Sequence, residues 1–205
     1  MGRYRSYIII GVICIVALIT WRSCRGWPIT NWPREIRTIV AYGDSITRGY
    51  GGKREKDYPT QLGERLGRKI INRGFDGARV ASGLERLEPD CLARQPDMVL
   101  LCLGGNDLLD KRPRSDVEPV LRSIIERLQQ NQVVVVLIEV EGPLGFGYGD
   151  MYKTLAREYG CIYVPNILKG VLGRPKLMHD QIHPNTAGYF QVALKVKDVI
   201  EPYLN

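Results

Sequence analysis

The chain has few of the residues and motifs on which several classes of function depend. It holds only two histidines, His179 and His183, so any histidine-based mechanism must use one of them. No G-x-G-x-x-G motif follows the first predicted strand, which excludes the usual dinucleotide-binding loop. The five cysteines form no C-x-x-C pair and no zinc-like spacing, and their odd number argues against a complete disulfide framework. Internal repeats and low-complexity tracts are also absent.

Acidic residues and lysines are missing from residues 1–34, which hold five arginines. The formal net charge of +7 is therefore concentrated at that end, because residues 35–205 carry 24 basic and 22 acidic residues. A nearly neutral body lacks the basic surface of a nucleic-acid binder, so no nucleic-acid partner is expected. A chain of 205 residues with 44% hydrophobic and 25% charged residues is typical of one globular domain.

Residues 7–21 form an uncharged apolar run with arginines on both sides. As a helix it would reach roughly 22 Å, which is short of a hydrocarbon core of about 30 Å. All three tryptophans, Trp21, Trp27 and Trp32, lie at the end of the run or just after it, as in the aromatic belt at a membrane surface. The run also resembles the apolar core of a signal peptide, although no good cleavage site follows it.

We therefore expect residues 1–26 to be an N-terminal membrane anchor or signal segment, with an uncleaved anchor preferred over a cleaved signal or an interfacial helix. Residues 27–34, with two prolines, are expected to be a short linker, and residues 35–205 the catalytic domain. The flanking arginines are balanced and do not set orientation, but the N-terminal position favours a domain on the exported, periplasmic or extracellular, face.

Apolar runs alternate with helical patterns along the body. The predicted buried strands are residues 36–42, 69–72, 98–103, 133–140 and 161–164. The predicted helices are residues 59–68, 80–94, a segment capped by Ser115 and Glu118, 150–159 and 184–203. This alternation predicts a three-layer α/β/α fold with a five-stranded parallel sheet, in which ligands bind outside the carboxyl ends of the strands.

Three segments at strand ends or helix starts carry candidate chemistry. Ser45 directly follows the first strand, where it could be a nucleophile or simply the N-cap of the next helix. Asn106 follows two glycines at the end of the third strand and could direct its amide at the same crevice. Asp180 precedes His183 by three residues, a spacing that fits a histidine base oriented by a carboxylate. As an alternative, His179, Asp180 and His183 could bind a metal, but Pro184 interrupts a shared helical face and no further ligand is obvious.

Four blocks in this order resemble the GDSL or SGNH hydrolase family, and most closely its bacterial thioesterase, lysophospholipase and arylesterase branch. They are AYGDSITRGYG from Ala41, INRGFDG from Ile71, LGGND from Leu103 and DQIHPNTAGY from Asp180. Together they span nearly the whole body. The resemblance implies a flavodoxin-like sheet and a serine esterase that needs no metal or organic cofactor.

The resemblance also implies a role for each matching residue. Ser45 matches the nucleophile, His183 the base and Asp180 its partner. The backbone N–H of Ser45, the backbone N–H of Gly77 and the side chain of Asn106 match the oxyanion-hole donors. Gly77 is the least secure match, because it is followed by Ala78 and Arg79 where relatives more often have an acidic residue and a threonine, and Gly74 is an alternative.

The substrate class expected from these residues is an acyl ester or thioester, either a small molecule or a lipid. Residues 142–149 and 167–178 are candidate rims of the site. The first could instead be a plain loop, and the second a core segment. A carbohydrate O-deacetylase of the same family and a non-catalytic, membrane-tethered binding protein remain as alternatives. The sequence does not indicate an oligomeric state.

Overall fold

The computed structural model describes residues 26–142 and 147–204, in which a parallel sheet forms the centre of an α/β fold. Its five strands lie in the order β2-β1-β3-β4-β5. They are β1 (Ile39–Gly43), β2 (Ile70–Gly74), β3 (Met98–Cys102), β4 (Val134–Ile138) and β5 (Ile162–Val164). All five predicted strands and the predicted fold class are confirmed. The three central strands, β1, β3 and β4, are buried along their whole length, as a covered parallel sheet requires, whereas the edge strand β2 is only partly buried.

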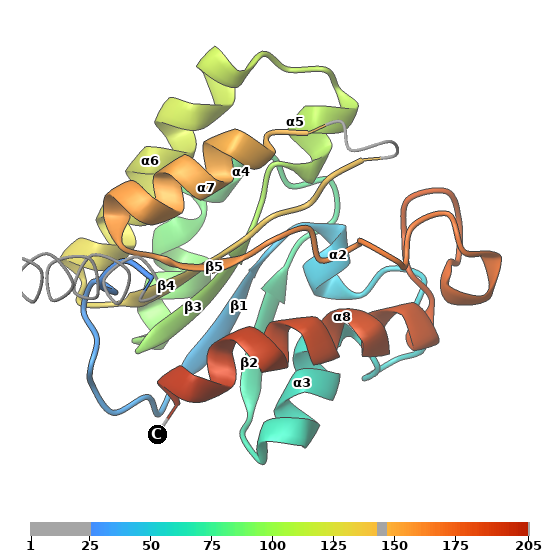
Figure 1. Ribbon diagram of the computed structural model, residues 1–205, viewed down its shortest axis with the longest axis horizontal. Coiled ribbons are helices and arrows are strands. Elements are labelled where there is room, and N and C mark those ends of the chain that lie inside the picture. Colours follow the sequence, from blue (N-terminus) through green and yellow to red (C-terminus); the bar gives the residue numbers. More distant parts are fainter. Residues whose placement is uncertain (1–25, 143–146, 205) are drawn as a thin grey trace, which may run out of the picture.

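Helices cover both faces of the sheet (Figure 1). They are α2 (Ser45–Arg48), α3 (Tyr58–Leu66), α4 (Val80–Glu85), α5 (Gly105–Leu109), α6 (Arg114–Gln130), α7 (Gly149–Tyr159) and α8 (Thr186–Ile200). Successive strand residues alternate between two cores, so Val99 packs with the α4, α6 and α7 side and Leu100 with the α3 and α8 side. Helices α2 and α5 follow the carboxyl ends of β1 and β3 within a few residues, so they begin at this edge of the sheet.

The single helix predicted over residues 80–94 is wrong. The structure has α4, then a π-helical turn at Leu87–Cys91 and a 3-10 turn at Leu92–Arg94. Pro89 lies inside this stretch and has no N–H for an α-helical hydrogen bond, which accounts for the change of helical type.

Two predicted helix starts are also wrong. Helix α6 begins at Arg114 with Pro113 as N-cap, and the Glu118 carboxylate accepts hydrogen bonds from Arg114 and Arg122 instead of completing a capping box with Ser115. Helix α8 begins at Thr186 and not at Pro184. Its N-cap is Asn185, whose side chain accepts from the backbone N–H groups of the first turn at 2.9 and 3.1 Å.

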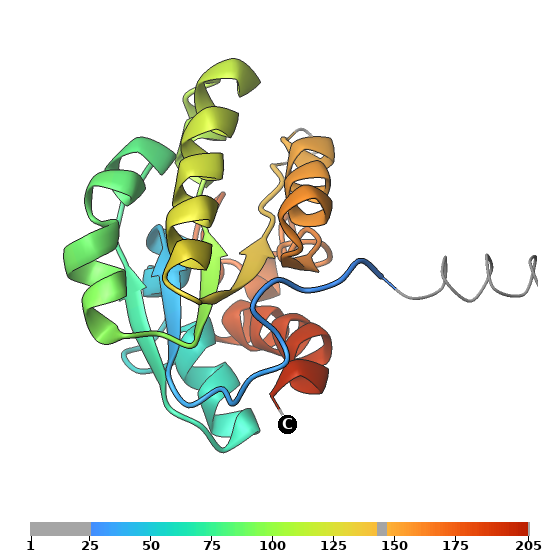
Figure 2. The ribbon, with the colours of Figure 1, turned by 90° about the vertical axis from the view of Figure 1, so that its left-hand side faces the viewer.

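Residues 27–34 lie against the domain. The Trp27 indole donates to the Cys161 carbonyl at 2.7 Å, and Thr30 donates through its hydroxyl to the Tyr159 carbonyl at 2.8 Å. Trp32 makes an edge contact with Tyr203, which follows α8. Figure 2 shows this N-terminal stretch, in blue, running beside the C-terminal helix, in red. Trp27 and Trp32 thus have partners within the domain, unlike residues of a membrane aromatic belt.

The predicted membrane anchor falls almost wholly on residues 1–25, outside the described part of the chain. Within residues 26–142 and 147–204, no helix combines the length and the apolar composition that crossing a membrane requires.

Candidate functional site

Ser45 is the first residue of α2, at the carboxyl end of the central strand β1. The N-cap of this helix is Asp44, whose side chain accepts from the Ile46 backbone N–H at 2.9 Å, so capping does not occupy the Ser45 hydroxyl. The preceding turn needs a glycine at position 43, because a Cβ there would lie 2.4 Å from the Cys102 carbonyl oxygen. Local structure thus presents the serine hydroxyl at the sheet edge.

Asp180 and His183 form a tight turn before α8. One carboxylate oxygen of Asp180 accepts from the backbone N–H groups of Ile182 and His183, at 2.9 and 2.8 Å. Its other oxygen lies 2.8 Å from His183 Nδ1. The His179 N–H closes the turn by donating to the His183 carbonyl at 2.8 Å. Together with the bonds to Asp180, this holds the imidazole in one orientation.

The structure brings Ser45, His183 and Asp180 together. Ser45 Oγ lies 3.0 Å from His183 Nε2, on the ring edge opposite the carboxylate. Because an ionised carboxylate only accepts, Nδ1 carries the proton that faces Asp180, and Nε2 of the neutral ring is left to accept from the serine hydroxyl. Burial alone would raise the pKa of Asp180, but hydrogen bonds from Ile182 and His183 outweigh it and lower this pKa to about 2. The carboxylate is therefore ionised at neutral pH.

Asn106 lies in α5, beyond the end of β3. Its side-chain Nδ2 donates to the Ala78 carbonyl at 2.9 Å, which fixes the amide and leaves the second N–H of the same nitrogen for another acceptor. Gly104 before it has φ +105°, and a Cβ there would lie 2.2 Å from the Tyr152 hydroxyl. Only glycine fits this turn, and Asn106, which follows it, lines the same pocket as Ser45.

Gly77 lies in the exposed turn after β2, with φ +72°. It is not among the residues that line the pocket, but the bond from Asn106 to Ala78 ties its turn to the site. The N–H of the alternative, Gly74, already donates to Asn72 Oδ1 at 2.9 Å. Gly77 is therefore the better placed of the two glycines to supply a backbone donor.

A mainly apolar pocket adjoins the serine and the histidine. Besides Ser45, His183 and Asn106, its polar lining comprises Asp44 and Glu141. Its apolar lining consists of Ile46, Leu108, Leu109, Val140, Leu168, Leu172 and Ile182. Both predicted rims contribute, through Gly142 from the first and Leu168 and Leu172 from the second. Ile167 and Val171 of the second rim are core residues, and residues 143–146 of the first lie outside the described part.

Asp44 is a buried acid beside the nucleophile position. Its side chain is 2% exposed, and burial raises its pKa to about 7 despite the hydrogen bond from the Ile46 N–H. Strongly perturbed acids of this kind concentrate at functional sites.

Three residues near the site, Tyr50, Glu139 and Glu141, were not predicted from the sequence. The ring of Tyr50 lies 4.6 Å from that of His183, and Glu139 and Glu141 stand beside the pocket. The two glutamates interrupt an otherwise apolar run, VVVVLIEVEG, and that interruption could have marked them.

The chain is similar in sequence and in fold to several known proteins. A sequence model of the GDSL-like lipase/acylhydrolase family matches residues 41–190. The thioesterase 1/protease 1/lysophospholipase L1 of Escherichia coli strain K12 is 27% identical over 177 residues, which cover 82% of this chain and 85% of that protein. The arylesterase of Vibrio mimicus is 30% identical over 158 residues, covering 71% of this chain and 79% of that protein.

A solved structure has a similar fold. The crystal structure of TesA superimposes with a TM-score of 0.77 at 26% identity, covering 82% of this chain and 99% of that one. The superposition reaches the full length of the solved chain, so no large part of that fold is missing here.

Proposed function

Because this chain belongs to the GDSL-like lipase/acylhydrolase family and is a serine ester hydrolase, we propose that it cleaves carboxylic esters or thioesters through an acyl-enzyme on Ser45. The observation that carries the proposal is the continuous relay of 3.0 Å from Ser45 Oγ to His183 Nε2 and 2.8 Å from His183 Nδ1 to Asp180. These distances lie within the range over which a base can take the proton of a nucleophile.

In the first step, Ser45 Oγ attacks the acyl carbon while its proton passes to His183 Nε2. Asp180 keeps the ring oriented and stabilises the positive charge that then forms on it. The former carbonyl oxygen becomes negative and accepts hydrogen bonds from the Ser45 N–H, the Gly77 N–H and Asn106 Nδ2. Collapse of this intermediate breaks the bond to the leaving alcohol or thiol, which takes the proton from His183.

In the second step, water replaces the leaving group. His183 Nε2 removes a proton from the water as its oxygen attacks the acyl carbon, and later returns that proton to Ser45 Oγ. The products are the free acid and the regenerated serine. Neither step calls for a metal or an organic cofactor.

The pocket lining favours an apolar acyl group as part of the substrate. Leu168 and Leu172 from one segment and Leu108 and Leu109 from another supply hydrocarbon surface beside the serine. Burying each methylene of an acyl chain there is worth about 0.8 kcal/mol. A carbohydrate O-deacetylase would gain nothing from such a surface, so longer acyl chains than acetyl are the better fit.

We also propose that the N-terminal segment, residues 1–26, tethers the catalytic domain to a membrane, on the exported face. The chain enters the domain beside Cys161, at the amino end of β5, whereas the pocket lies at the carboxyl ends of the strands. A tether at that edge would hold the pocket away from the bilayer, which favours esters that diffuse in water. Membrane flotation of the full chain, compared with a version lacking the first 26 residues, tests the tether.

Hydrolysis of p-nitrophenyl esters of increasing acyl length tests the activity. We expect kcat/KM to rise from acetyl to butyryl and hexanoyl, and Ser45→Ala to abolish turnover while leaving the circular dichroism spectrum unchanged. Turnover retained by purified Ser45→Ala would refute the nucleophile, and a steep fall beyond acetyl would favour the deacetylase.

A further inference from the structure

Two glutamates at the carboxyl end of β4 stand beside the pocket but outside the proposed proton relay. Glu139 follows the strand directly and is 2% exposed. Glu141 is half-buried and lines the pocket together with Ser45 and His183. Asp44, the other acid of the lining, is buried, which leaves Glu141 as the acid whose charge can meet a substrate.

One oxygen of each glutamate is held by donors from β5 and the loop after it. Glu139 Oε2 accepts from the Tyr163 hydroxyl and from the Asn166 backbone N–H, the latter at 3.2 Å. Glu141 Oε2 accepts from Asn166 Nδ2 at 2.6 Å. Because Asn166 serves both carboxyls, the two side chains are fixed relative to each other.

The remaining oxygen of Glu139 has no donor. Oε1 is fully buried, and no hydrogen-bond partner for it exists among residues 26–142 and 147–204. The carboxyls of Glu139 and Glu141 are close enough to interact through a side-chain hydrogen bond. A Cβ added to Gly149, at the start of α7, would lie 2.6 Å from Glu139 Oε1 and 3.0 Å from Glu141 Oε1. The Oε1 atoms of both glutamates therefore lie close to one point beside Gly149.

Among the described residues, no neighbouring group supplies a compensating positive charge. The titratable groups around Glu139 are Glu141, Tyr163 on β5 and Tyr152 on α7, and Asp150 on α7 interacts with Tyr163. In the described part of the chain neither glutamate pairs with a lysine or an arginine. Burial first, and then the Glu141 carboxyl, raise the pKa of Glu139, although the bonds from Tyr163 and Asn166 oppose this. Two carboxylates so close cannot both be ionised at low cost.

We propose that Glu139 and Glu141 share one proton between their Oε1 atoms, and that Glu139 thereby positions the single negative charge of Glu141 at the pocket wall to select substrates that carry a positively charged group. Glu139 is a positioning residue that acts through Glu141. The apolar lining strengthens the attraction, because a charge meets less screening there than in water. An anionic group on the substrate is disfavoured for the same reason. This inference rests on the proposed function.

Matched charged and uncharged substrates test the selectivity. One pair places the charge on the leaving group, S-butyrylthiocholine against the S-3,3-dimethylbutyl thioester of butyrate. The other places it on the acyl group, p-nitrophenyl 6-aminohexanoate against p-nitrophenyl heptanoate. In at least one pair we expect Glu141→Gln to lower the charged-to-uncharged ratio of kcat/KM about tenfold, mainly through KM. Glu158→Gln on the outer side of α7 is the matched control and should keep the wild-type ratio.

Ratios within twofold of wild type in both pairs for Glu141→Gln would overturn the selectivity. Failure of the proposed function is a separate outcome, because it would appear as equal turnover by wild type and Ser45→Ala on the uncharged esters. A loss of ratio in Glu158→Gln as well would assign the effect to the overall charge and not to Glu141.

The pH profile tests the shared proton. In wild type the charged-to-uncharged ratio should rise as pH rises and the pair loses its proton, because the pair then carries two negative charges instead of one. Glu139→Gln replaces the titrating proton with a permanent amide donor, so its ratio should stay constant over the same range. Identical profiles for wild type and Glu139→Gln would overturn the proposal.

A measurement on the unaltered protein covers the case in which Glu139→Gln does not fold. Carbon-13 NMR titration of glutamate-labelled wild type should show one carboxyl that titrates above the usual glutamate range near pH 4.3. If every glutamate titrates in or below the usual range, no proton is shared.

Discussion

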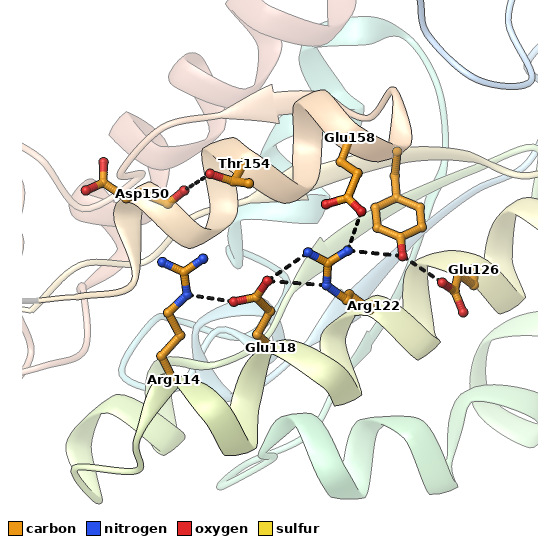
Figure 3. Close-up of polar contacts among 8 residues, drawn as sticks. Arg114, Glu118, Arg122, Glu126, Asp150, Thr154 and Glu158 are labelled. Carbon is orange, nitrogen blue, oxygen red and sulfur yellow. Dashed lines mark hydrogen bonds and ion pairs between the residues drawn. The ribbon is translucent and has the colours of Figure 1, made fainter.

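Acidic side chains in two regions of the molecule have opposite surroundings. Between α6 and α7, Glu118 accepts from Arg114 and Arg122, and Glu158 accepts from Arg122 at 2.6 Å (Figure 3). These hydrogen bonds lower the pKa of both glutamates. At the carboxyl edge of the sheet, Asp44 and Glu139 are buried without an arginine partner, and burial raises the pKa of each.

The difference shows how the fold separates structural charges from reactive ones. The α6–α7 ion pairs are partly exposed, so each contributes at most about 1 kcal/mol to stability. Their charges already have hydrogen-bond partners and do not need a ligand to neutralise them. The buried acids at the sheet edge cost stability, and such costs are tolerated where loops carry chemistry. The perturbed acids, and not the most visible ion pairs, therefore mark the functional edge.

Asp180 is the exception at the sheet edge, and its replacement should have the largest effect. Its low pKa, about 2, comes from hydrogen bonds to Ile182 and His183, so it behaves like a paired acid. Asp180→Asn should lower kcat by up to about 10⁴-fold, because an amide does not stabilise the imidazolium or enforce its tautomer. Steady-state hydrolysis of p-nitrophenyl butyrate measures this. A change of less than tenfold would mean that the carboxylate serves the turn and not the base.

Asn106 tests whether a neutral donor at the same edge stabilises developing charge. Asn106→Ala should lower kcat by about 10²–10³-fold with a smaller change in KM, because the hydrogen bond strengthens only as the oxyanion forms. The Michaelis parameters for one ester measure the split, and thermal unfolding controls for loss of the bond to Ala78. An effect confined to KM would contradict an oxyanion role.

Asp44 tests the cost of the buried acids through pH. Its pKa is raised from 3.8 to about 7, so between these values the native state binds more protons than the unfolded state. This group should therefore lower the free energy of unfolding as pH rises from about 4 to about 7, with no further change above that. Asp44→Asn should flatten this slope in urea titrations at several pH values. An unchanged slope would show that Asp44 is ionised throughout.

Replacing Arg122 should have the smallest effect, and it should change stability and not activity. Arg122→Ala removes the bonds to Glu118, Glu158 and Tyr159 and should destabilise the protein by about 1 kcal/mol, less in high salt. Urea unfolding at low and high ionic strength measures the loss, and ester hydrolysis should not change. A drop in kcat would contradict the claim that the α6–α7 ion pairs contribute only to stability.

The sequence predicts the strands well and the helix ends poorly, for physical reasons. A continuous apolar run such as VVVVLI is buried whatever its neighbours are, so β4 follows from composition. A helix start depends on which partner the side chains find. Glu118 had two options, and the arginines on either side of it along the helix, not Ser115, bind its carboxylate.

The same reason limits what the sequence says about the site. The Asp180 and His183 pair is local, three residues apart, and its orientation could be predicted from the spacing. The contact of His183 with Ser45 joins residues 138 positions apart. From the sequence it could be predicted only through the family resemblance. Glu139 and Glu141 are paired through Asn166 from another segment, and no local pattern reveals such a partner.

Covalent labelling tests the central claim most directly. A fluorophosphonate probe reacts with a serine only when a base activates it and an oxyanion site receives the phosphoryl oxygen. After labelling of the wild-type enzyme and digestion, mass spectrometry should find the adduct on Ser45, and none should form in Ser45→Ala. An adduct on a different residue, or active wild-type enzyme that does not react with the probe, would contradict the proposed mechanism.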